Sequence, residues 1–186
     1  MEVEVSAEAK DKRLNRMVAV TVVLLSVFMG LCNIKDGNIV QAMAQAKADA
    51  VDTWGEYQAD KTKLHIAETA HAQIGLLPGA ASADAKAEQA RLAAQITKYK
   101  AQAPQLAEKA KGFEARYDAL NVHDDQFDAS EASLSTAISI AAVAALVESF
   151  WVLIAAWIFG GFGLFMGTCG FAGWAFHPDI LSSFLG

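Results

Sequence analysis

The residues best suited to chemistry in this chain are histidines and carboxylates, which gather in two places. His65, Glu68 and His71 follow one another at intervals of three residues, and imidazole with carboxylate is a ligand set used by zinc and di-metal centres. Intervals of three turn progressively around a helix of 3.6 residues per turn. Residues 83–120 also contain no histidine that would complete a site. We therefore expect an ordinary polar helix face here and no metal.

The second group lies just before the apolar C-terminal part of the chain and consists of His123, Asp124, Asp125, Asp128 and Glu131. Their oxygens could hold a divalent cation, but the spacing is not that of a known calcium loop. Hydration at a membrane interface and helix capping explain these acids more simply, with Asp128 or Ser130 as the N-cap of a following helix.

No other pattern in the chain predicts a reaction. Cys32 and Cys169 could pair in an oxidising compartment, although apolar packing is the preferred interpretation. There is no glycine-rich phosphate loop, no CxxC motif and no Ser-His-Asp or Cys-His arrangement of known spacing. The net charge of −6 argues against a nucleic-acid partner. We expect a protein that is not an enzyme, with no catalytic, cofactor-binding or metal-binding residue.

The apolar residues are concentrated in segments that could cross a membrane. The chain is 54% apolar with a mean hydropathy of +0.25, which is high for a soluble protein. Residues 17–34 carry no charge and would span about 27 Å as a helix, against roughly 30 Å of bilayer core. A signal peptide is the competing interpretation, but no small-x-small cleavage site follows. We prefer an uncleaved first transmembrane helix.

The segment 132–178 contains a single charged residue, Glu148, and would measure about 70 Å as one helix, so it must fold back. A turn at 148–150 gives transmembrane helices at 130–147 and 151–173, followed by a tail at 174–186. A turn at Gly160-Gly161 would instead place Glu148 in mid-span, where it costs about 2.5–3.5 kcal/mol and would be a candidate proton carrier. We prefer the first partition.

Basic residues set the expected orientation. Lys10, Lys12, Arg13 and Arg16 precede the first span, and only Lys35 follows it directly. The positive-inside rule then makes residues 1–16 a cytoplasmic tail. Three spans then place residues 36–129 outside the cytoplasm.

Residues 36–129 are expected to form a helical hairpin. The turn-rich run GLLPGAAS at 75–82 separates helices at about 39–74 and 83–120. Pro104 predicts a bend in one continuous helix, because the apolar pattern keeps its phase on both sides. The second helix carries a heptad seam formed by Leu92, Ile96, Tyr99, Ala103, Leu106, Ala110, Phe113, Tyr117 and Leu120. The looser face of the first helix is formed by Ile39, Met43, Ala46, Ala50, Trp54, Tyr57, Leu64 and Ile74.

Two features favour association. The alanine-rich seam would bury little area, so the hairpin is expected to pack against copies of itself or a partner as a bundle of four or more helices. The third span carries glycines at intervals of three and four, which allow close helix approach, either to another protein or to the first or second span. The interface candidates are Gly160, Gly163, Gly167, Gly170, Leu92, Ile96, Tyr99, Leu106, Phe113, Tyr117, Trp54 and Tyr57.

Two stretches resemble a family of bacterial membrane proteins catalogued as domain of unknown function 4337. They are QAMAQAKADAVDTWGEYQADKTKLH at 41–65, with Trp54, Tyr57 and Gln58, and FDASEASL at 127–134. The resemblance covers nearly the whole chain. It implies one N-terminal span, a helical middle and two C-terminal spans, and it implies no activity or site residue.

The expected protein is therefore an all-α membrane protein with three transmembrane helices and a long, coiled-coil-like extramembrane hairpin between the first and second. Its expected role is non-enzymatic assembly, as a homo-oligomer or an accessory subunit of a larger membrane complex, in contact with membrane lipids. The alternative is a small oligomeric channel or transporter. The near absence of ionisable residues in the spans argues against that alternative, whereas a Glu148 buried beside a water-filled cavity would favour it.

Overall fold

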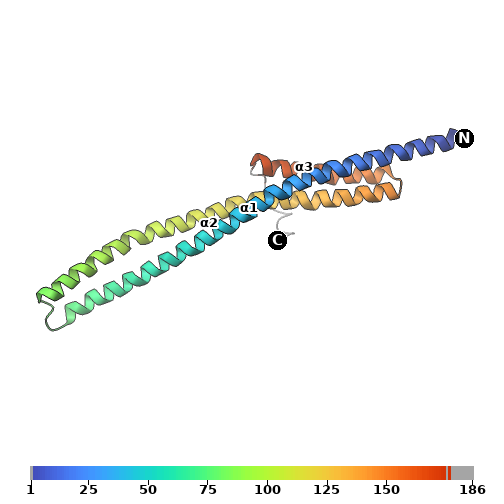
Figure 1. Cartoon of the computed structure of the whole chain (residues 1–186). Coiled ribbons are helices and arrows are strands. Elements are labelled where there is room, and N and C mark those ends of the chain that lie inside the picture. Colours follow the sequence, from blue (N-terminus) through green and yellow to red (C-terminus); the bar gives the residue numbers. More distant parts are fainter. Residues whose placement is uncertain (1, 175, 177–186) are drawn as a thin grey trace. The chain divides into compact units, whose positions relative to one another are not determined.

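The fold consists of three long helices joined by two short turns (Figure 1). The computed structural model describes residues 2–174 and 176, with side chains from residue 12 onward. Helix α1 covers Glu2–Leu76, α2 covers Ala83–Leu146 and α3 covers Phe150–Ala172. The chain divides into two compact units. Unit 1 comprises residues 1–42 and 119–186, and unit 2 comprises residues 43–118.

Helices α1 and α2 continue without a break where the sequence suggested separate elements. The segments 17–34 and 39–74 both belong to α1, and the segments 83–120 and 130–147 belong to α2 up to Leu146. The expectation that Asp128 or Ser130 caps a helix is wrong, because both lie inside α2 and no glycine or proline interrupts residues 113–146. The Ser130 hydroxyl instead donates a hydrogen bond to the carbonyl oxygen of Gly163, at 2.8 Å.

The turn between α2 and α3 falls at residues 147–149. Glu148 is exposed and has a φ of 51°, a left-handed conformation that costs an L-residue free energy. Ser149 is extended and precedes α3, and its N–H donates to the carbonyl of Ala144 at 3.1 Å. The alternative turn at Gly160-Gly161 is absent, since both glycines lie inside α3.

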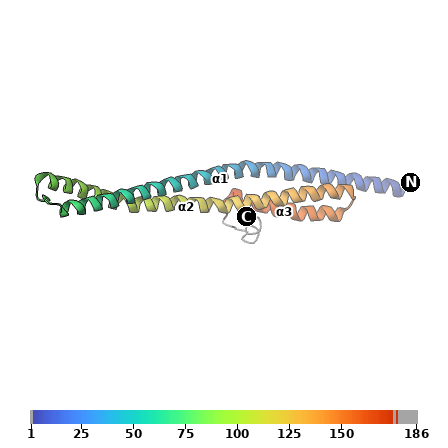
Figure 2. The same ribbon diagram turned by 90° about the horizontal axis from the view of Figure 1, so that it is seen from below.

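In unit 1 the helices pack through small residues and leucines. α3 runs beside α2 there (Figures 1 and 2). It also meets α1, because Gly160 faces Leu25 and Gly167 faces Phe28. One cluster of the core contains Leu14, Val18, Ala141, Ala144, Leu153 and Ala156. A second contains Leu25, Leu134 and Ala137.

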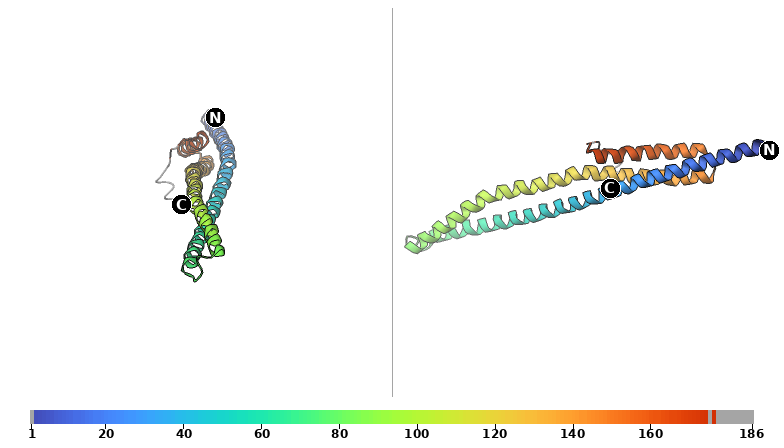
Figure 3. Two further views of the ribbon diagram at one scale, coloured as in Figure 1. Left: turned by 90° about the vertical axis from the view of Figure 1, so that its left-hand side faces the viewer. Right: turned by 45° about the horizontal axis from the view of Figure 1, so that its top comes forward.

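Unit 2 is an antiparallel pair formed by the C-terminal part of α1 and the N-terminal part of α2 (Figure 3). Its buried side chains are mostly small, which allows the two helices to approach closely. They are Met43, Ala46, Ala50, Thr53, Leu64, Ala67, Leu92, Ala103 and Ala110. α2 continues through the exposed Pro104 without ending, as the unbroken phase of the seam predicted.

Each of the three helices is long and apolar enough to cross a membrane, by length and composition. The apolar part of α1 turns large side chains outward, and Val23 and Leu24 are 60% and 64% exposed. α3 does the same with Trp151, which is 81% exposed, and with Ile158 and Phe165. In water such surfaces would be costly.

The left-handed backbone conformation of Glu148 can be tested by substitution with glycine. Glu148→Gly should raise the free energy of unfolding by about 1 kcal/mol, because glycine adopts positive φ without steric cost. In detergent the melting temperature should rise by roughly 2–4 °C. Glu148→Ala removes the same charge but keeps a Cβ, so an equal gain in that variant would contradict the backbone explanation.

Candidate interaction sites

The glycine face of α3 is covered by the chain's own helices. All four glycines are buried. A Cβ added at Gly163 would lie 2.8 Å from Cγ of Leu134, and one at Gly167 would lie 2.6 Å from the Phe28 ring. Gly160 faces Leu25, and Gly170 faces the ring of Phe127. These contacts support the alternative in which the glycines pack against the first and second spans of the same chain. The glycines let α1 and α2 of the same chain approach α3.

Polar groups meet at this close approach. Besides its bond to Gly163, the Ser130 hydroxyl lies 3.8 Å from Sγ of Cys32. Cys32 and Cys169 are both buried free thiols, so the disulfide considered above is not formed. They fill space in the bundle, as the packing interpretation expected.

A glutamine that the sequence analysis did not single out ties the residues after α3 to α2. The side chain of Gln126 is fully buried, and its Nε2 donates to the carbonyl oxygens of Trp174 at 2.7 Å and Phe176 at 2.5 Å. Nδ1 of His123 lies 3.0 Å from Oε1 of Gln126. His123 is therefore part of the hydrogen-bond network around Gln126. A buried polar side chain of this kind leaves no periodic signal in the sequence.

The acidic group before the second expected span gains a member from α1. Asp36 and Asp124 each have a buried Oδ1 without a hydrogen-bond donor. Burial, with Asp124 and Asp128 nearby, raises the pKa of Asp36 to about 6. Burial is also the main cause that raises the pKa of Asp124. In the part of the chain whose side chains are described, no group of three or more such residues has an arrangement that could hold a metal ion.

In the group of His65, Glu68 and His71 on α1, Glu68 contacts a residue of α2. Nζ of Lys100 lies 2.7 Å from Oε1 of Glu68, which joins the two helices of unit 2. The hydrogen bond from Lys100 is the main cause that lowers the pKa of Glu68. His65 is exposed and His71 half-buried. Glu68 thus supports the hairpin.

The hairpin candidates lie along the contact between α1 and α2 in unit 2. Leu92 is buried, whereas Ile96, Leu106 and the aromatic candidates are half-buried. The indole Nε1 of Trp54 donates to Oε1 of Glu114 at 2.9 Å, and its ring packs edge-on against Tyr57 at 5.4 Å. Lysine ammonium groups lie over two other rings, Lys47 over Tyr117 at 5.5 Å and Lys63 over Tyr99 at 5.8 Å. The seam therefore pairs the two helices, but its aromatic rings remain partly accessible.

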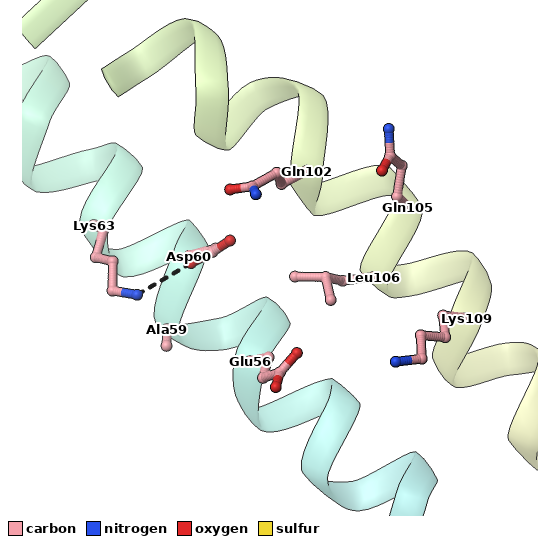
Figure 4. A pocket seen from close by; sticks show the side chains of 8 residues that line it. All are labelled: Glu56, Ala59, Asp60, Lys63, Gln102, Gln105, Leu106 and Lys109. Atoms are coloured by element: carbon pink, nitrogen blue, oxygen red, sulfur yellow. Dashed lines mark hydrogen bonds and ion pairs between the residues drawn. The ribbon is translucent and has the colours of Figure 1, made fainter. Parts of the chain in front are cut away.

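Two grooves flank this seam. Groove 1, of about 460 Å³ (Figure 4), is lined by Glu56, Ala59, Asp60, Lys63, Gln102, Gln105, Leu106 and Lys109. Groove 2, of about 400 Å³, is lined by Tyr57, Lys61, Leu64, Glu68, Lys100, Ala103, Pro104 and Ala107. The linings use different faces of both helices, so the grooves lie on opposite sides of the contact.

These features define an all-α protein whose three helices are each able to cross a membrane. The chain belongs to the family described as domain of unknown function (DUF4337), whose model matches residues 14–173. The resemblance of the sequence to this family is thereby confirmed. No curated protein and no solved structure matches the chain.

The contacts of the glycines in α3 predict that the same substitution has different effects on stability at Gly167 and at Gly161. Gly167→Ala should lower the free energy of unfolding by about 1–3 kcal/mol, because its Cβ would overlap Phe28 and Cys32. Gly161→Ala is the matched control, since its Cβ would meet nothing within 4 Å and alanine favours the helix. Thermal unfolding at a concentration where the protein is monomeric separates this effect from association. Equal effects of the two substitutions would contradict the close approach.

Proposed function

We propose that this chain is a non-enzymatic membrane assembly protein that anchors its helical hairpin to a bilayer and self-associates through it. The hairpin stands between the first and second of three transmembrane helices. The observation that carries the proposal is groove 1 of unit 2, whose charges and accessible side chains suit a second copy of the same hairpin.

The surface of unit 1 supports the membrane anchor. Its outward side chains include Val20, Val27, Leu31 and Ile34 on α1 and Phe162 and Phe165 on α3. Lipid tails would cover such side chains without cost, and the backbone groups of helices are satisfied internally. Trp151, at the start of α3, suits an interfacial position.

The charges of groove 1 support self-association. Its lining contains two acids and two bases (Figure 4). Lys63 and Asp60 form an ion pair at 3.2 Å. Glu56 and Lys109 stand on opposite helices, and neither has an ion pair within the described part of the chain. A copy related by a two-fold axis would place its Lys109 against Glu56 and its Glu56 against Lys109.

The geometry of the hairpin gives a reason for a four-helix bundle. Five of the nine buried side chains in unit 2 are alanines, which bring the helices close but remove little apolar surface from water. The half-buried rings of Tyr99 and Phe113 would lose their remaining exposure in a bundle. A larger complex that contains a complementary helix pair could occupy the same groove.

The proposed topology is that of a bacterial inner membrane protein with a cytoplasmic N-terminus and a periplasmic hairpin. The cluster of basic residues before the first span supports this orientation. A channel or transporter has less support, because Glu148 is exposed at a turn and is not buried in a span.

Charge reversal tests the self-association. Lys109→Glu should weaken the association roughly tenfold, since like charges would meet at both symmetric positions. Glu56→Lys should act in the same way, and the double exchange should restore association. Lys111→Glu is the control, because Lys111 is exposed and does not line the groove. The readout is light scattering of the full chain in mild detergent. If all four variants associate as the wild type does, groove 1 is not the interface.

Cysteine accessibility tests the topology. Ser82→Cys, at the hairpin turn, should react with a membrane-impermeant maleimide added to intact cells whose outer membrane is permeable to it. Glu148→Cys should react only after lysis. The native Cys32 and Cys169 are buried and should contribute little background. The reverse pattern of labelling would invert the topology.

A further inference from the structure

The strongest unexplained feature of unit 1 is a pair of carboxyl groups on two packed helices. Oδ1 of Asp36 on α1 and Oδ1 of Asp124 on α2 are both buried and have no donor. An ionised carboxylate can only accept hydrogen bonds, and a buried acceptor without a donor is costly. The two carboxyl groups lie within hydrogen-bonding reach of each other, so one proton placed between them would turn one group into a donor to the other.

The surroundings of the pair add negative charge. Asp128 and Glu131 on α2 act on Asp36, and Asp125 acts on Asp124. The nearest basic residue along α1 is Lys35, which is exposed, and His123 on α2 is bonded to Gln126. α3 carries no charged side chain; Cys169 is its one titratable group. Cys32, four residues before Asp36 on α1, is the other titratable group that interacts with Asp36.

We propose that Asp36 and Asp124 share one proton across the contact of α1 with α2 and form a pH-sensitive clasp. In the protonated state the clasp holds the two helices together just outside the first span. When both groups ionise, their repulsion loosens this contact. The proposal concerns unit 1 alone and does not depend on self-association.

The direction of the pH effect follows from the chemistry of the pair. The pKa of Asp36 is raised from 3.8 to about 6, first by burial and then by the charge of Asp124. A proton bound more tightly in the folded state stabilises that state below the ordinary pKa of 3.8. The stabilisation declines as the pH rises and is lost above about 6. The folded contact should therefore weaken between mildly acidic and neutral pH.

The test uses the full chain in detergent, with Asp36→Asn and Asp124→Asn as variants. An asparagine amide supplies a permanent donor in place of the shared proton. Each variant should melt roughly 2–5 °C above the wild type at pH 8. The gain should shrink at pH 5, so that the variants lose the wild type's decline in stability between these pH values. Asp52→Asn removes an exposed carboxylate of α1 and should keep the wild-type pH dependence.

A second measurement detects the shared proton in the wild-type protein directly. Infrared spectroscopy of the wild type should show a protonated carboxyl band at pH 5.5 that disappears by pH 8 and is absent from Asp36→Asn. The proposal is overturned if that band is missing from the wild type, or if Asp36→Asn keeps the wild-type pH dependence. Stabilisation by Ca²⁺ or Mg²⁺ at pH 8 that disappears in Asp36→Asn would also overturn it, because the pair would then hold a cation and not a proton.

Discussion

The packing of unit 1 depends on the absence of side chains at one face of α3. At Gly163, Gly167 and Gly170 the atoms of α1 and α2 come closer than a Cβ would allow. This approach brings the Gly163 carbonyl within reach of the Ser130 hydroxyl. In a bilayer, where helices gain little from the hydrophobic effect, such contacts and hydrogen bonds are the main source of association. The three helices can therefore form one bundle within a single chain.

The same constraint explains which helix surfaces remain exposed. While the buried glycines of α3 point inward with Leu153 and Met166, other large side chains point outward, including Trp157, Ile158 and Phe162. Trp157 still uses its indole Nε1, which donates to the Thr21 hydroxyl of α1 at 2.9 Å. The indole N–H group of Trp157 therefore has a hydrogen-bond partner, and that partner carries no charge.

The elements of the fold could be predicted from the sequence because they depend on local patterns. The missing charges marked the apolar segments, and the high cost of burying Glu148 favoured a turn at 148–150. The structure has this turn one residue earlier, at 147–149. The heptad phase predicted that α2 would continue through Pro104. An N-cap at Asp128 or Ser130 was wrong, because capping residues also occur inside helices when their side chains have other partners.

The candidate sites were harder to predict because they depend on contacts distant in sequence. A glycine stripe shows that some helix comes close but does not identify which one. Asp36 lies far along the chain from Asp124, so a search for local acid clusters did not include it. Gln126 could not be distinguished from an exposed glutamine, since its role depends on carbonyl groups that follow α3.

Unit 2 differs from unit 1 because its close helix contact leaves aromatic rings partly exposed. The proposed function depends on this exposure. The alanines of unit 2 bring two helices together but leave the rings of Tyr99, Phe113 and Tyr117 half-buried. The most direct test is the mass of the intact wild-type complex after native extraction in mild detergent. We predict a mass that is a multiple of 19.8 kDa, with at least two copies of the chain. A monodisperse species of one copy, without any co-purifying protein, would contradict it.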